Sequence, residues 1–416
     1  MKKLVKPSKI SGLVDAPASK SMVQRALAAA LLAPEPAAIL NVTYSSDAQA
    51  ALRVIKALGA RVTIRDKTVS IEGGMNPTGE VLNCGESGLS MRMFSAVATL
   101  WHREITLTGE GSLLTRPVSM IEKPLKELGV TVSSTQGCPP LTVKGPLSGG
   151  EAEVDGSVSS QFLTGLLIAL PAASRDSCLK VKNLKSTPYI DMTLTLLKSC
   201  GIRIENKDYK IFRIKGKQRY RVGEYRVEGD WSGASFLLVA GALGGDIRVT
   251  GLDPTSHQAD RRIIDALQAA GAAVSLSSAT IEIKKQSLSA FDFDATDCPD
   301  LFPPLVILAC NCAGTTAIKG VERLKYKESN RAAVLQKEFT GLGARIRIEG
   351  DIMKIDGTKL TGGTVDSHND HRIAMAGALS AINAAGEIAI TGSDCVAKSY
   401  PDFFEDFSAI GGIVHE

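Results

Sequence analysis

The chain has 416 residues, with 48 Lys and Arg against 44 Asp and Glu, a formal net charge of +4 and 5% aromatic residues. So small a charge excess is untypical of a polyelectrolyte binder, and so few aromatic residues disfavour stacking on single-stranded nucleic acid. The longest apolar stretches run to about eight residues, whereas a membrane span needs about 20. We therefore expect a chain of several domains with neither a nucleic-acid nor a membrane partner.

The amino-terminal sequence, MKKLVKPSKISG, is basic but has no apolar stretch behind it. Pro7 and Lys9 interrupt the region that a secretory signal would need to be apolar. The eight cysteines are scattered along the chain, which is typical of reduced thiols in a cytoplasmic protein. The expected location is therefore the cytoplasm.

Taken in chain order, the first recurring element is an amphipathic helix that ends in glycine and precedes a strand pair, as in ALRVIKALGARVTI. The marker glycines are Gly59, Gly129, Gly201, Gly271, Gly343 and Gly411. They are spaced by 70, 72, 70, 72 and 68 residues. A glycine at this position closes the end of a helix in a left-handed conformation without a Cβ penalty. Six repeats of this kind therefore account for the whole chain.

A second recurring element lies out of phase with the first and consists of a polar turn followed by a small-residue apolar helix. Its copies are APASKSMVQRALAAALLA, NCGESGLSMRMFSAVATL, GSVSSQFLTGLLIAL, GDWSGASFLLVAGAL, DCPDLFPPLVILAC and DSHNDHRIAMAGALSA. These helices are apolar nearly all round, which predicts that they are buried. Their starts are rich in residues that cap helices.

The two elements together predict an α/β (α+β) fold. Each repeat combines a buried helix, strands, an amphipathic outer helix and a closing hairpin. Three repeats can close around one bundle of buried helices, which gives two similar domains. A helix amino terminus presents free N–H groups and a positive dipole, so it binds anions. If the buried helices of a domain run parallel, their amino termini converge, and two such ends facing each other would suit polyanionic small molecules.

Polar and basic residues concentrate at the predicted starts of the buried helices: Lys20, Ser21, Arg25, Arg92, Ser159, Ser160, Gln161, His371 and Arg372. Lys20 and Ser21 are expected at the N-cap of the first of these helices, and Arg25 lies one turn on. A Lys, a hydroxyl and an Arg at one helix start suit a carboxylate or phosphate. An ordinary capped helix with solvated charges is the alternative for this segment. For the segment 156–161, a simple N-cap is an equally good interpretation.

Two charged segments are further candidates. The run from Arg323 to Arg331 carries five charges, and a solvated surface is the usual interpretation of such a run. The sequence Asn-Asp-His-Arg at 369–372 heads an apolar helix, and a charged cluster that must enter a buried helix is less easily placed on the surface. Asp300, Arg116 and Lys398 are isolated candidates. The sequence contains no GxxxxGK[ST], GxGxxG, HExxH or GxSxG motif, and we predict neither a metal nor a cofactor.

Six segments carry a resemblance to a known family: SKS with Arg25, SVSSQF, STPYID, KESNR, NDHR and AKSYPDF. In this order, and over essentially the entire chain, they resemble the enolpyruvyl transferases and among them the EPSP synthases. The resemblance implies an inverse α/β barrel of two domains, each with three βαβαββ repeats around buried parallel helices. It also implies that the amino-terminal segment joins the second domain, so that the domains span 19–226 and 1–18 with 227–416.

The family transfers the enolpyruvyl group of phosphoenolpyruvate to the 5-hydroxyl of shikimate 3-phosphate, with release of phosphate, on the shikimate pathway to chorismate and the aromatic amino acids. The resemblance implies shikimate 3-phosphate contacts at Lys20, Ser21, Arg25, Ser159, Ser160, Gln161, Ser186, Tyr189, Asp300 and Lys327. It implies phosphoenolpyruvate contacts at Lys20, Gly88, Arg116, Gln161, Arg331, Arg372 and Lys398. The implied catalytic residues are Asp300, Glu328, Lys20 and Lys327, with Asp300 and Lys327 at the reacting hydroxyl and Glu328 at the methylene carbon. We expect a monomer without a cofactor.

The chain departs from the family at Glu86, Leu89 and Met93, where Asn, Thr or Ser, and Pro are common. The sequence therefore leaves the response to the inhibitor glyphosate open. Arg323 also stands where some members have Asn.

One alternative is the sister enzyme, UDP-N-acetylglucosamine enolpyruvyl transferase. It usually has Lys-Asn at Lys20-Ser21 and a cysteine at the position of Gly111. The other alternative is a non-catalytic binding protein of the same fold, against which Lys20, Asp300, Glu328 and Arg372 argue.

Overall fold

The computed structural model describes residues 1–278, 280–325 and 327–416, so Tyr326 of the charged run lies outside the described residues. The chain divides into two compact units. We call residues 1–19 with 228–416 the terminal unit, and residues 20–227 the central unit. Both mix helices with mixed sheets, and the expected α/β fold class is confirmed.

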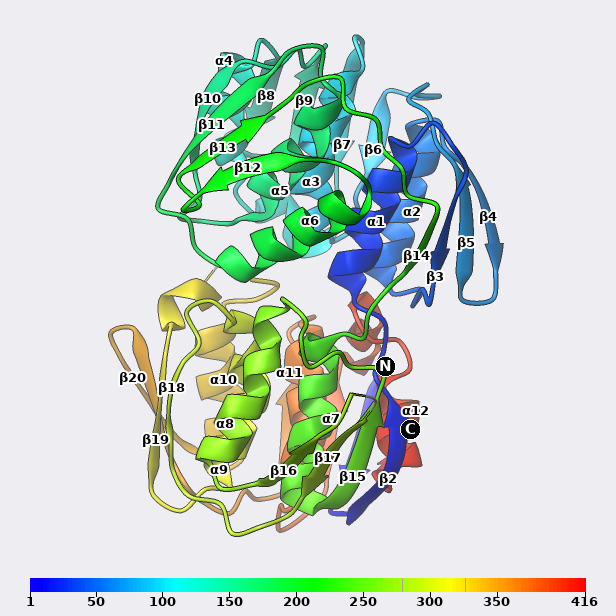
Figure 1. Ribbon diagram of the computed structural model, residues 1–416. Helices are drawn as coiled ribbons and strands as arrows, with labels where there is room; N and C mark the ends of the chain where they lie inside the picture. The colour runs from blue at the N-terminus through cyan, green and yellow to red at the C-terminus, as the bar shows by residue number, and fades with distance from the viewer. Residues whose placement is uncertain (279, 326) are drawn as a thin grey trace. The chain divides into compact units, whose positions relative to one another are not determined.

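The central unit, all of which is described, holds three four-stranded sheets in the orders β14-β3-β5-β4, β6-β7-β9-β8 and β10-β11-β13-β12 (Figure 1). Its strands are β3 (Ala37–Leu40), β4 (Arg61–Arg65), β5 (Thr68–Glu72), β6 (Val81–Asn83), β7 (Glu104–Thr108), β8 (Thr131–Thr135), β9 (Cys138–Lys144), β10 (Glu151–Asp155), β11 (Ser177–Lys182), β12 (Ile204–Lys207), β13 (Ile211–Ile214) and β14 (Glu224–Arg226). Its helices are α1 (Lys20–Leu31), α2 (Ser46–Ala57), α3 (Gly88–Val97), α4 (Glu122–Glu127), α5 (Gln161–Ala169) and α6 (Thr187–Ser199).

The described part of the terminal unit repeats this plan, with sheets in the orders β16-β17-β15-β2, β18-β19-β21-β20 and β22-β23-β1-β24. Its strands are β1 (Lys2–Lys6), β2 (Ile10–Asp15), β15 (Gly245–Thr250), β16 (Ala273–Leu276), β17 (Thr280–Lys284), β18 (Asp292–Asp294), β19 (Thr315–Lys319), β20 (Arg345–Glu349), β21 (Ile352–Asp356), β22 (Gly363–Asp366), β23 (Ile388–Thr391) and β24 (Ile413–His415). Its helices are α7 (Trp231–Gly244), α8 (Ile263–Ala269), α9 (Phe302–Cys310), α10 (Arg331–Thr340), α11 (His371–Ala381) and α12 (Phe403–Ala409).

Three strands join sheets that are built mainly from distant parts of the chain. In the terminal unit β2 pairs in parallel with β15, and β1 lies between β23 and β24, antiparallel to both. In the central unit β14 pairs in parallel with β3, which follows α1. The amino-terminal strands therefore complete the first and last repeats of the terminal unit, and β14 completes the first repeat of the central unit.

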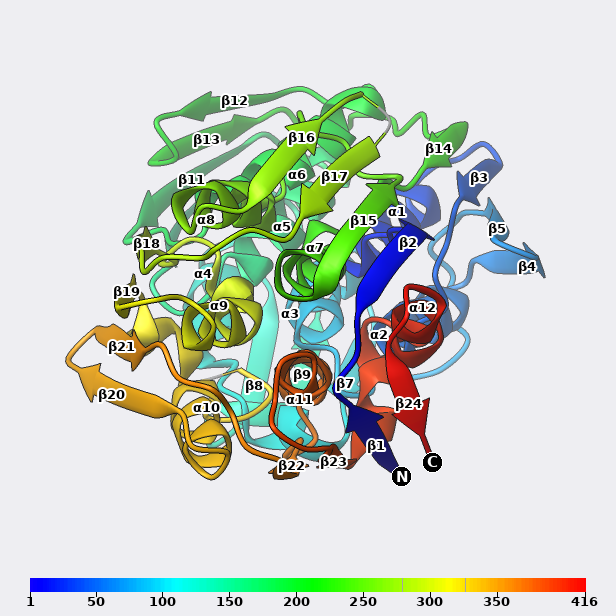
Figure 2. The same ribbon diagram turned by 90° about the horizontal axis from the view of Figure 1, so that it is seen from below.

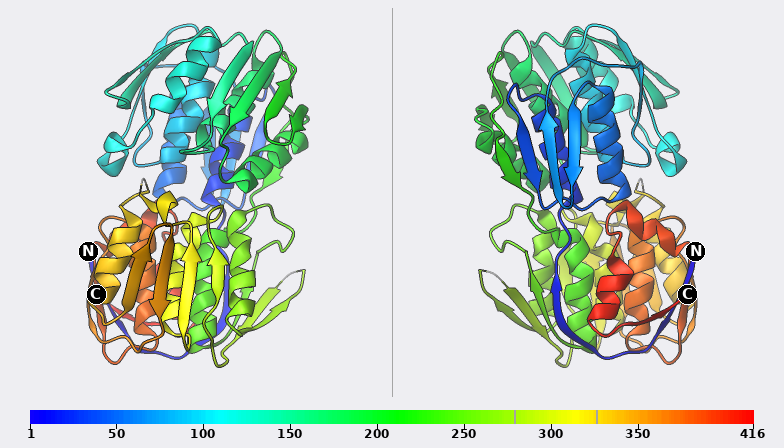
Figure 3. Two further views of the ribbon diagram at one scale, coloured as in Figure 1. Left: turned by 90° about the vertical axis from the view of Figure 1, so that its left-hand side faces the viewer. Right: turned by 90° about the vertical axis from the view of Figure 1, so that its right-hand side faces the viewer.

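The helices predicted to be buried form the core of each unit. Every residue of α7 from Trp231 to Leu243 is buried, as are all residues of α3, α9 and α11. Figure 2 shows α7, α9 and α11 nearly end-on, with strands of the same unit around them. In Figure 3 the sheet of β18 to β21 (yellow to orange) and the sheet of β3 to β5 (blue) each cover the outside of their own unit. Among the described residues, no helix is long and apolar enough to cross a membrane.

The marker glycines have the predicted conformation. All six have a positive φ, between 80° at Gly201 and 114° at Gly59. At the end of α2 the N–H of Gly59 donates to the carbonyl of Lys56, and the N–H of Ala60 donates to that of Ile55. This pair of bonds closes the last helical turn and turns the chain into the next strand. The same pair recurs after the other five glycines.

Candidate active site

In the central unit the starts of three buried helices meet. Gln24, near the start of α1, accepts hydrogen bonds from the hydroxyls of Ser87 (2.9 Å) and Ser90 (2.8 Å) at the start of α3. Arg92 of α3 donates to the side chain of Gln161, the first residue of α5, over 2.8 Å. The amino-terminal turns of α1, α3 and α5 therefore lie together, and their N–H groups and dipoles favour an anion there.

A fully buried cation stands at this end of the central unit. Arg25 donates to the hydroxyl of Thr193 (2.9 Å) and to the carbonyls of Ser21 (2.9 Å) and Tyr189 (3.3 Å). Burial lowers the pKa of Arg25 to about 10, so the guanidinium still carries its charge at neutral pH. These three hydrogen bonds go to neutral groups, which leaves the charge of Arg25 suited to an anionic ligand.

Two further guanidinium groups flank Gly88, the first residue of α3. A Cβ atom built at Gly88 would lie 3.0 Å from Nη1 of Arg92 and 3.0 Å from Nη1 of Arg116. Arg116 follows the short 3-10 helix η2 (Gly111–Thr115) and is buried. Only a residue without a side chain lets both cations approach the start of α3 this closely. Arg92 was predicted at a helix start but without a role, and its position early in an apolar helix was the available signal.

The start of α1 differs from the expectation. Lys20 and Ser21 were expected at the N-cap, but α1 begins at Lys20, so they are its first two residues. The ammonium group of Lys20 lies 3.0 Å from a carboxylate oxygen of Asp47, in the first turn of α2. Both side chains are largely buried, with 15% and 13% of their surface exposed. Sequence reasoning missed Asp47, because only the fold brings it to Lys20.

The predicted serines lie at the starts of α5 and α6. The hydroxyl of Ser159 accepts from the N–H of Gln161 over 3.2 Å. Ser160 is the N-cap residue of α5 and is buried, but its hydroxyl makes no cap hydrogen bond. Ser186 precedes α6 with a left-handed backbone, φ 58°, and Tyr189 in the first turn of α6 offers its carbonyl to Arg25.

In the terminal unit, too, the starts of three buried helices meet. Arg372, the second residue of α11, donates to the hydroxyl of Ser232 at the start of α7 over 2.6 Å. The same guanidinium lies 3.3 Å from a carboxylate oxygen of Asp300. Asp300 belongs to the 3-10 helix η6 (Pro299–Leu301), which leads directly into α9. The amino termini of α7, α9 and α11 therefore converge on Arg372 and Asp300.

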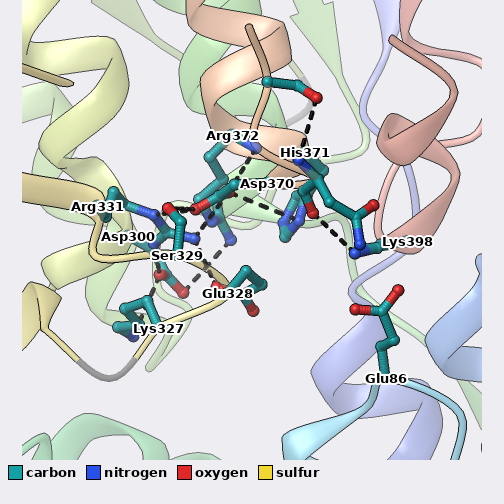
Figure 4. Close-up of polar contacts among 12 residues, drawn as sticks. Glu86, Asp300, Lys327, Glu328, Ser329, Arg331, Asp370, His371, Arg372 and Lys398 are labelled. Carbon is teal, nitrogen blue, oxygen red and sulfur yellow. Dashed lines mark hydrogen bonds and ion pairs between the residues drawn. The ribbon is translucent and has the colours of Figure 1, made fainter. Parts of the chain in front are cut away.

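Arg331 is the centre of this arrangement (Figure 4). It is the first residue of α10, and none of its side chain is exposed. Its guanidinium contacts Asp300 at 2.8 Å, Glu328 at 2.6 Å and Asp370 at 2.9 Å. Burial by itself lowers the pKa of Arg331, but the three carboxylates outweigh it and raise that pKa. The solvated interpretation of the charged run is therefore wrong for Arg331. We call Asp300, Lys327, Glu328, Arg331, Asp370 and Arg372 the acid–base cluster.

Lys327 brings a second cation to Asp300. Its ammonium group lies 3.2 Å from a carboxylate oxygen of Asp300. Burial lowers the pKa of Lys327, with help from the cations Arg331 and Arg323, while Asp300 and Glu328 act in the opposite direction. A lysine with a lowered pKa exchanges its proton more readily near neutral pH than an ordinary lysine does. The pair of Lys327 and Asp300 can therefore handle a hydroxyl proton.

Asp370 ties the cluster to the start of α11. It is the N-cap residue of this helix and accepts from the N–H of Arg372 over 3.0 Å. Its carboxylate also accepts from Arg331 and from the hydroxyl of Ser329, the latter over 3.0 Å. The segment 369–372 was predicted as a candidate site segment, but Asp370 itself was given no role. Its cap position before a buried helix was the signal.

Lys398 lies at the same helix start. It ends the 3-10 helix η8 (Ser393–Lys398), is buried, and donates to the carbonyl of Asn369 over 2.7 Å. Asn369 and His368 both have left-handed backbones, with φ of 57° and 49°. This bend turns the Asn369 carbonyl toward Lys398, beside α11. Among the described residues, no group of three or more His, Cys, Asp or Glu side chains is placed to hold a metal ion.

The predicted residues thus gather in two places. Asp300, Lys327, Glu328, Arg331 and Arg372 form one connected set in the terminal unit, and Lys398 lies beside the same helix start. In the central unit, Ser21, Tyr189 and Arg25 are in contact, and Gln161 is joined to the start of α3 through Arg92.

The comparisons with known proteins agree with one another. The family model of EPSP synthase (3-phosphoshikimate 1-carboxyvinyltransferase) matches residues 4–407. The chain is 38% identical to the 3-phosphoshikimate 1-carboxyvinyltransferase of Clostridium novyi, over 99% of this chain and 97% of that protein. It is 37% identical to the enzyme of the same name from Aeropyrum pernix, over 99% and 96%.

Two solved structures are similar over the whole chain. The EPSP synthase of Acinetobacter baumannii has a TM-score of 0.84 and 25% identity, with 100% of both chains covered. The enolpyruvyl transferase NikO of Streptomyces tendae has a TM-score of 0.80 at 18% identity, over 100% of this chain and 98% of that one. The second similarity concerns the fold alone.

Proposed function

Because the chain belongs to the EPSP synthase family, we propose that it transfers the enolpyruvyl group of phosphoenolpyruvate to the 5-hydroxyl of shikimate 3-phosphate. The transfer forms an ether bond between the hydroxyl oxygen and C2 of phosphoenolpyruvate. It breaks the bond between C2 and the bridging oxygen, which leaves with phosphate. The hydroxyl proton is removed, and the released phosphate takes up a proton, so the reaction balances. This step belongs to the shikimate route to chorismate and the aromatic amino acids.

The observation that carries this proposal is the acid–base cluster. Two carboxyl groups, those of Asp300 and Glu328, contact the same buried guanidinium, that of Arg331. The chemistry needs one group that removes the hydroxyl proton and one that delivers a proton to the methylene carbon for part of the reaction. We assign the hydroxyl to Asp300 with Lys327, and the methylene carbon to Glu328. Lys20 is the fourth catalytic residue that we assign.

Cationic and helix-start groups suit the two anionic substrates. We assign phosphoenolpyruvate to Lys20, Gly88, Arg116, Gln161, Arg331, Arg372 and Lys398. We assign shikimate 3-phosphate to Lys20, Ser21, Arg25, Ser159, Ser160, Gln161, Ser186, Tyr189, Asp300 and Lys327. Guanidinium groups hold planar carboxylates and phosphates with paired hydrogen bonds, and they offset the repulsion between two anions. The same charges stabilise the departing phosphate.

We propose that the central and terminal units are the two three-repeat domains expected from the sequence, 19–226 and 1–18 with 227–416. We further propose that the enzyme acts as a monomer in the cytoplasm and needs no cofactor. Light scattering of the purified protein tests the monomeric state, and fractionation of cells tests the location. Assay of dialysed enzyme with a chelator tests whether a cofactor is needed.

Phosphate release tests the proposed function. Purified protein is given phosphoenolpyruvate with shikimate 3-phosphate, with UDP-N-acetylglucosamine, or with no acceptor. We expect stoichiometric phosphate only with shikimate 3-phosphate. Release with the nucleotide sugar would assign the chain to the sister activity. No release with either acceptor would indicate a binding protein of the same fold.

A further inference from the structure

A buried carboxylate that the proposed mechanism does not use lies beside the acid–base cluster. Asp260 belongs to the 3-10 helix η5 (Ala259–Arg262), and only 3% of the residue is exposed. Its carboxylate is hydrogen-bonded to the hydroxyl of Ser232, at the start of α7. A buried carboxylate is costly unless its surroundings make use of its charge, so its neighbours decide what it does.

Ser232 connects Asp260 to the proposed site. The Ser232 hydroxyl accepts from Nη2 of Arg372 over 2.6 Å, and Arg372 also lies 3.3 Å from Asp300. A hydroxyl that accepts from a guanidinium still has its own proton to donate to a carboxylate. The groups therefore form a continuous chain from Asp260 through Ser232 and Arg372 to Asp300.

The charged groups around this chain include the cations Lys327, Arg331 and Arg372 and the carboxylates Asp230, Asp260, Asp300, Glu328 and Asp370. Burial raises the pKa of Asp260 to about 6, and the negative charges of Asp300 and Asp230 add to this, while Arg372 and the Ser232 hydrogen bond lower it. The thiol of Cys298 also interacts with Asp260. Asp260 therefore gains its charge as the pH rises through about 6.

We propose that Asp260 is a positioning residue, which holds Arg372 through Ser232 and whose negative charge makes Asp300 a stronger proton acceptor. This inference rests on the proposed function, because it assigns Asp300 to the hydroxyl proton. Two like charges that share a site repel each other, and a proton taken up by either one relieves the repulsion. Above pH 6 Asp260 is ionised, so the transfer of the hydroxyl proton to Asp300 gains this relief. Below pH 6 Asp260 is neutral and the gain disappears.

The pH dependence of kcat separates this role from a purely structural one. In the wild-type enzyme kcat should rise as the pH passes through about 6, where Asp260 ionises. In Asp260→Asn the rise near pH 6 should be absent, and the plateau above it should be lower by about threefold to tenfold, as expected for a weaker acceptor. Asp265→Asn is the matched control, because Asp265 is an exposed carboxylate on the adjoining helix α8, paired with Arg262 at 3.4 Å. It should leave the profile unchanged.

Ser232→Ala tests separately whether Asp260 holds Arg372 in position through Ser232. This variant keeps the charge of Asp260 but removes the hydroxyl that holds Arg372. KM for phosphoenolpyruvate should rise about tenfold, as for the loss of a hydrogen bond to a charged group. The rise of kcat with pH should remain but move to a higher pH, because the hydrogen bond that lowers the pKa of Asp260 is lost. An unchanged KM in Ser232→Ala would contradict the proposal that Asp260 positions Arg372 through Ser232.

Carbon-13 NMR of aspartate carboxyl groups measures the interaction between the charges of Asp260 and Asp300 without an activity assay. In the wild-type protein the Asp260 signal should titrate with a midpoint of about 6. In Asp300→Asn that midpoint should fall, because the repelling charge has been removed. A rise of kcat near pH 6 that persists in Asp260→Asn, or a midpoint of Asp260 that Asp300→Asn does not lower, would overturn the proposal. If the wild-type protein transferred no enolpyruvyl group, the proposed function would fail while the NMR result still decided the coupling.

Discussion

At the scale of single residues, the terminal unit depends on charges that are buried together. Arg331 is fully buried, and a buried guanidinium without partners would be very unfavourable. Three carboxylates at 2.6 to 2.9 Å compensate for the lost hydration. Such a network fixes the geometry of Asp300 and Glu328, and it makes the removal of any one partner costly.

Asp370→Ala should therefore destabilise the protein by about 3 kcal/mol, because it leaves part of a buried cation without its counter-charge. Asp356→Ala is the control. Asp356 also accepts two bonds from one arginine, Arg347, but the Arg347 side chain is 51% exposed. An exposed pair contributes about 0–1 kcal/mol. Urea unfolding of the two variants measures the difference, and equal losses would show that burial of the network does not matter.

Gly88 supports a second prediction at this scale. Gly88→Ala places a methyl group 3.0 Å from the guanidinium groups of Arg92 and Arg116, so both must shift. We expect KM for phosphoenolpyruvate to rise about tenfold, which corresponds to about 1.4 kcal/mol of lost binding. Alanine favours a helix more than glycine does, so thermal stability should be kept. A variant with unchanged KM would contradict the placement of phosphoenolpyruvate at Arg116.

At the scale of elements, the repeat is defined by local sequence. Each outer helix ends in a glycine with a positive φ, and each buried helix starts at a polar turn, so both features could be predicted without the structure. The partners of Arg331 could not, because Asp300 and Asp370 lie 31 and 39 residues away in the sequence. The contact between Lys20 and Asp47 is hidden for the same reason. β2 and β14 each pair with a strand from a distant part of the chain, and this pairing leaves no periodic signal in the sequence. Only the family resemblance indicated that the chain crosses between domains.

The marker glycines give a prediction at this scale. Gly201 has φ 80° and open space around its Cα, so a substitution there tests backbone conformation alone. Gly201→Ala should cost about 1 kcal/mol, the price of a left-handed alanine. Gly79→Ala is the control, since Gly79 also faces open space but has no left-handed backbone. It should be neutral or slightly stabilising. Equal unfolding free energies for both variants would contradict the C-cap role of Gly201.

At the scale of the whole molecule, the first residues of the chain complete its last repeat. β1 is an inner strand, bonded to β23 on one side and β24 on the other, and Val5 on it is fully buried. The terminal unit is therefore closed by both ends of the chain, while the central unit is built from residues 20–227 alone.

Deletion of residues 1–6 should consequently weaken the terminal unit and spare the central one. Removing β1 leaves β24 without a partner strand and uncovers apolar surface. Hydrogen exchange should show lost protection in β22, β23 and β24, with protection of β6 to β13 unchanged. Lys2→Ser with Lys6→Ser serves as the control, since both lysines are exposed and the backbone ladder remains. Uniform loss of protection across both units after the deletion would contradict this account.

The central claim is that the enzyme moves a carbon fragment and does not simply hydrolyse a phosphate ester. Phosphoenolpyruvate labelled with oxygen-18 at the bridging position distinguishes the two, because only transfer breaks the bond between C2 and that oxygen. With shikimate 3-phosphate present, phosphorus-31 NMR should show the label in the released phosphate, in step with formation of the enolpyruvyl ether. Unlabelled phosphate, with the heavy oxygen retained in pyruvate, would mean cleavage at phosphorus and would contradict the proposed function.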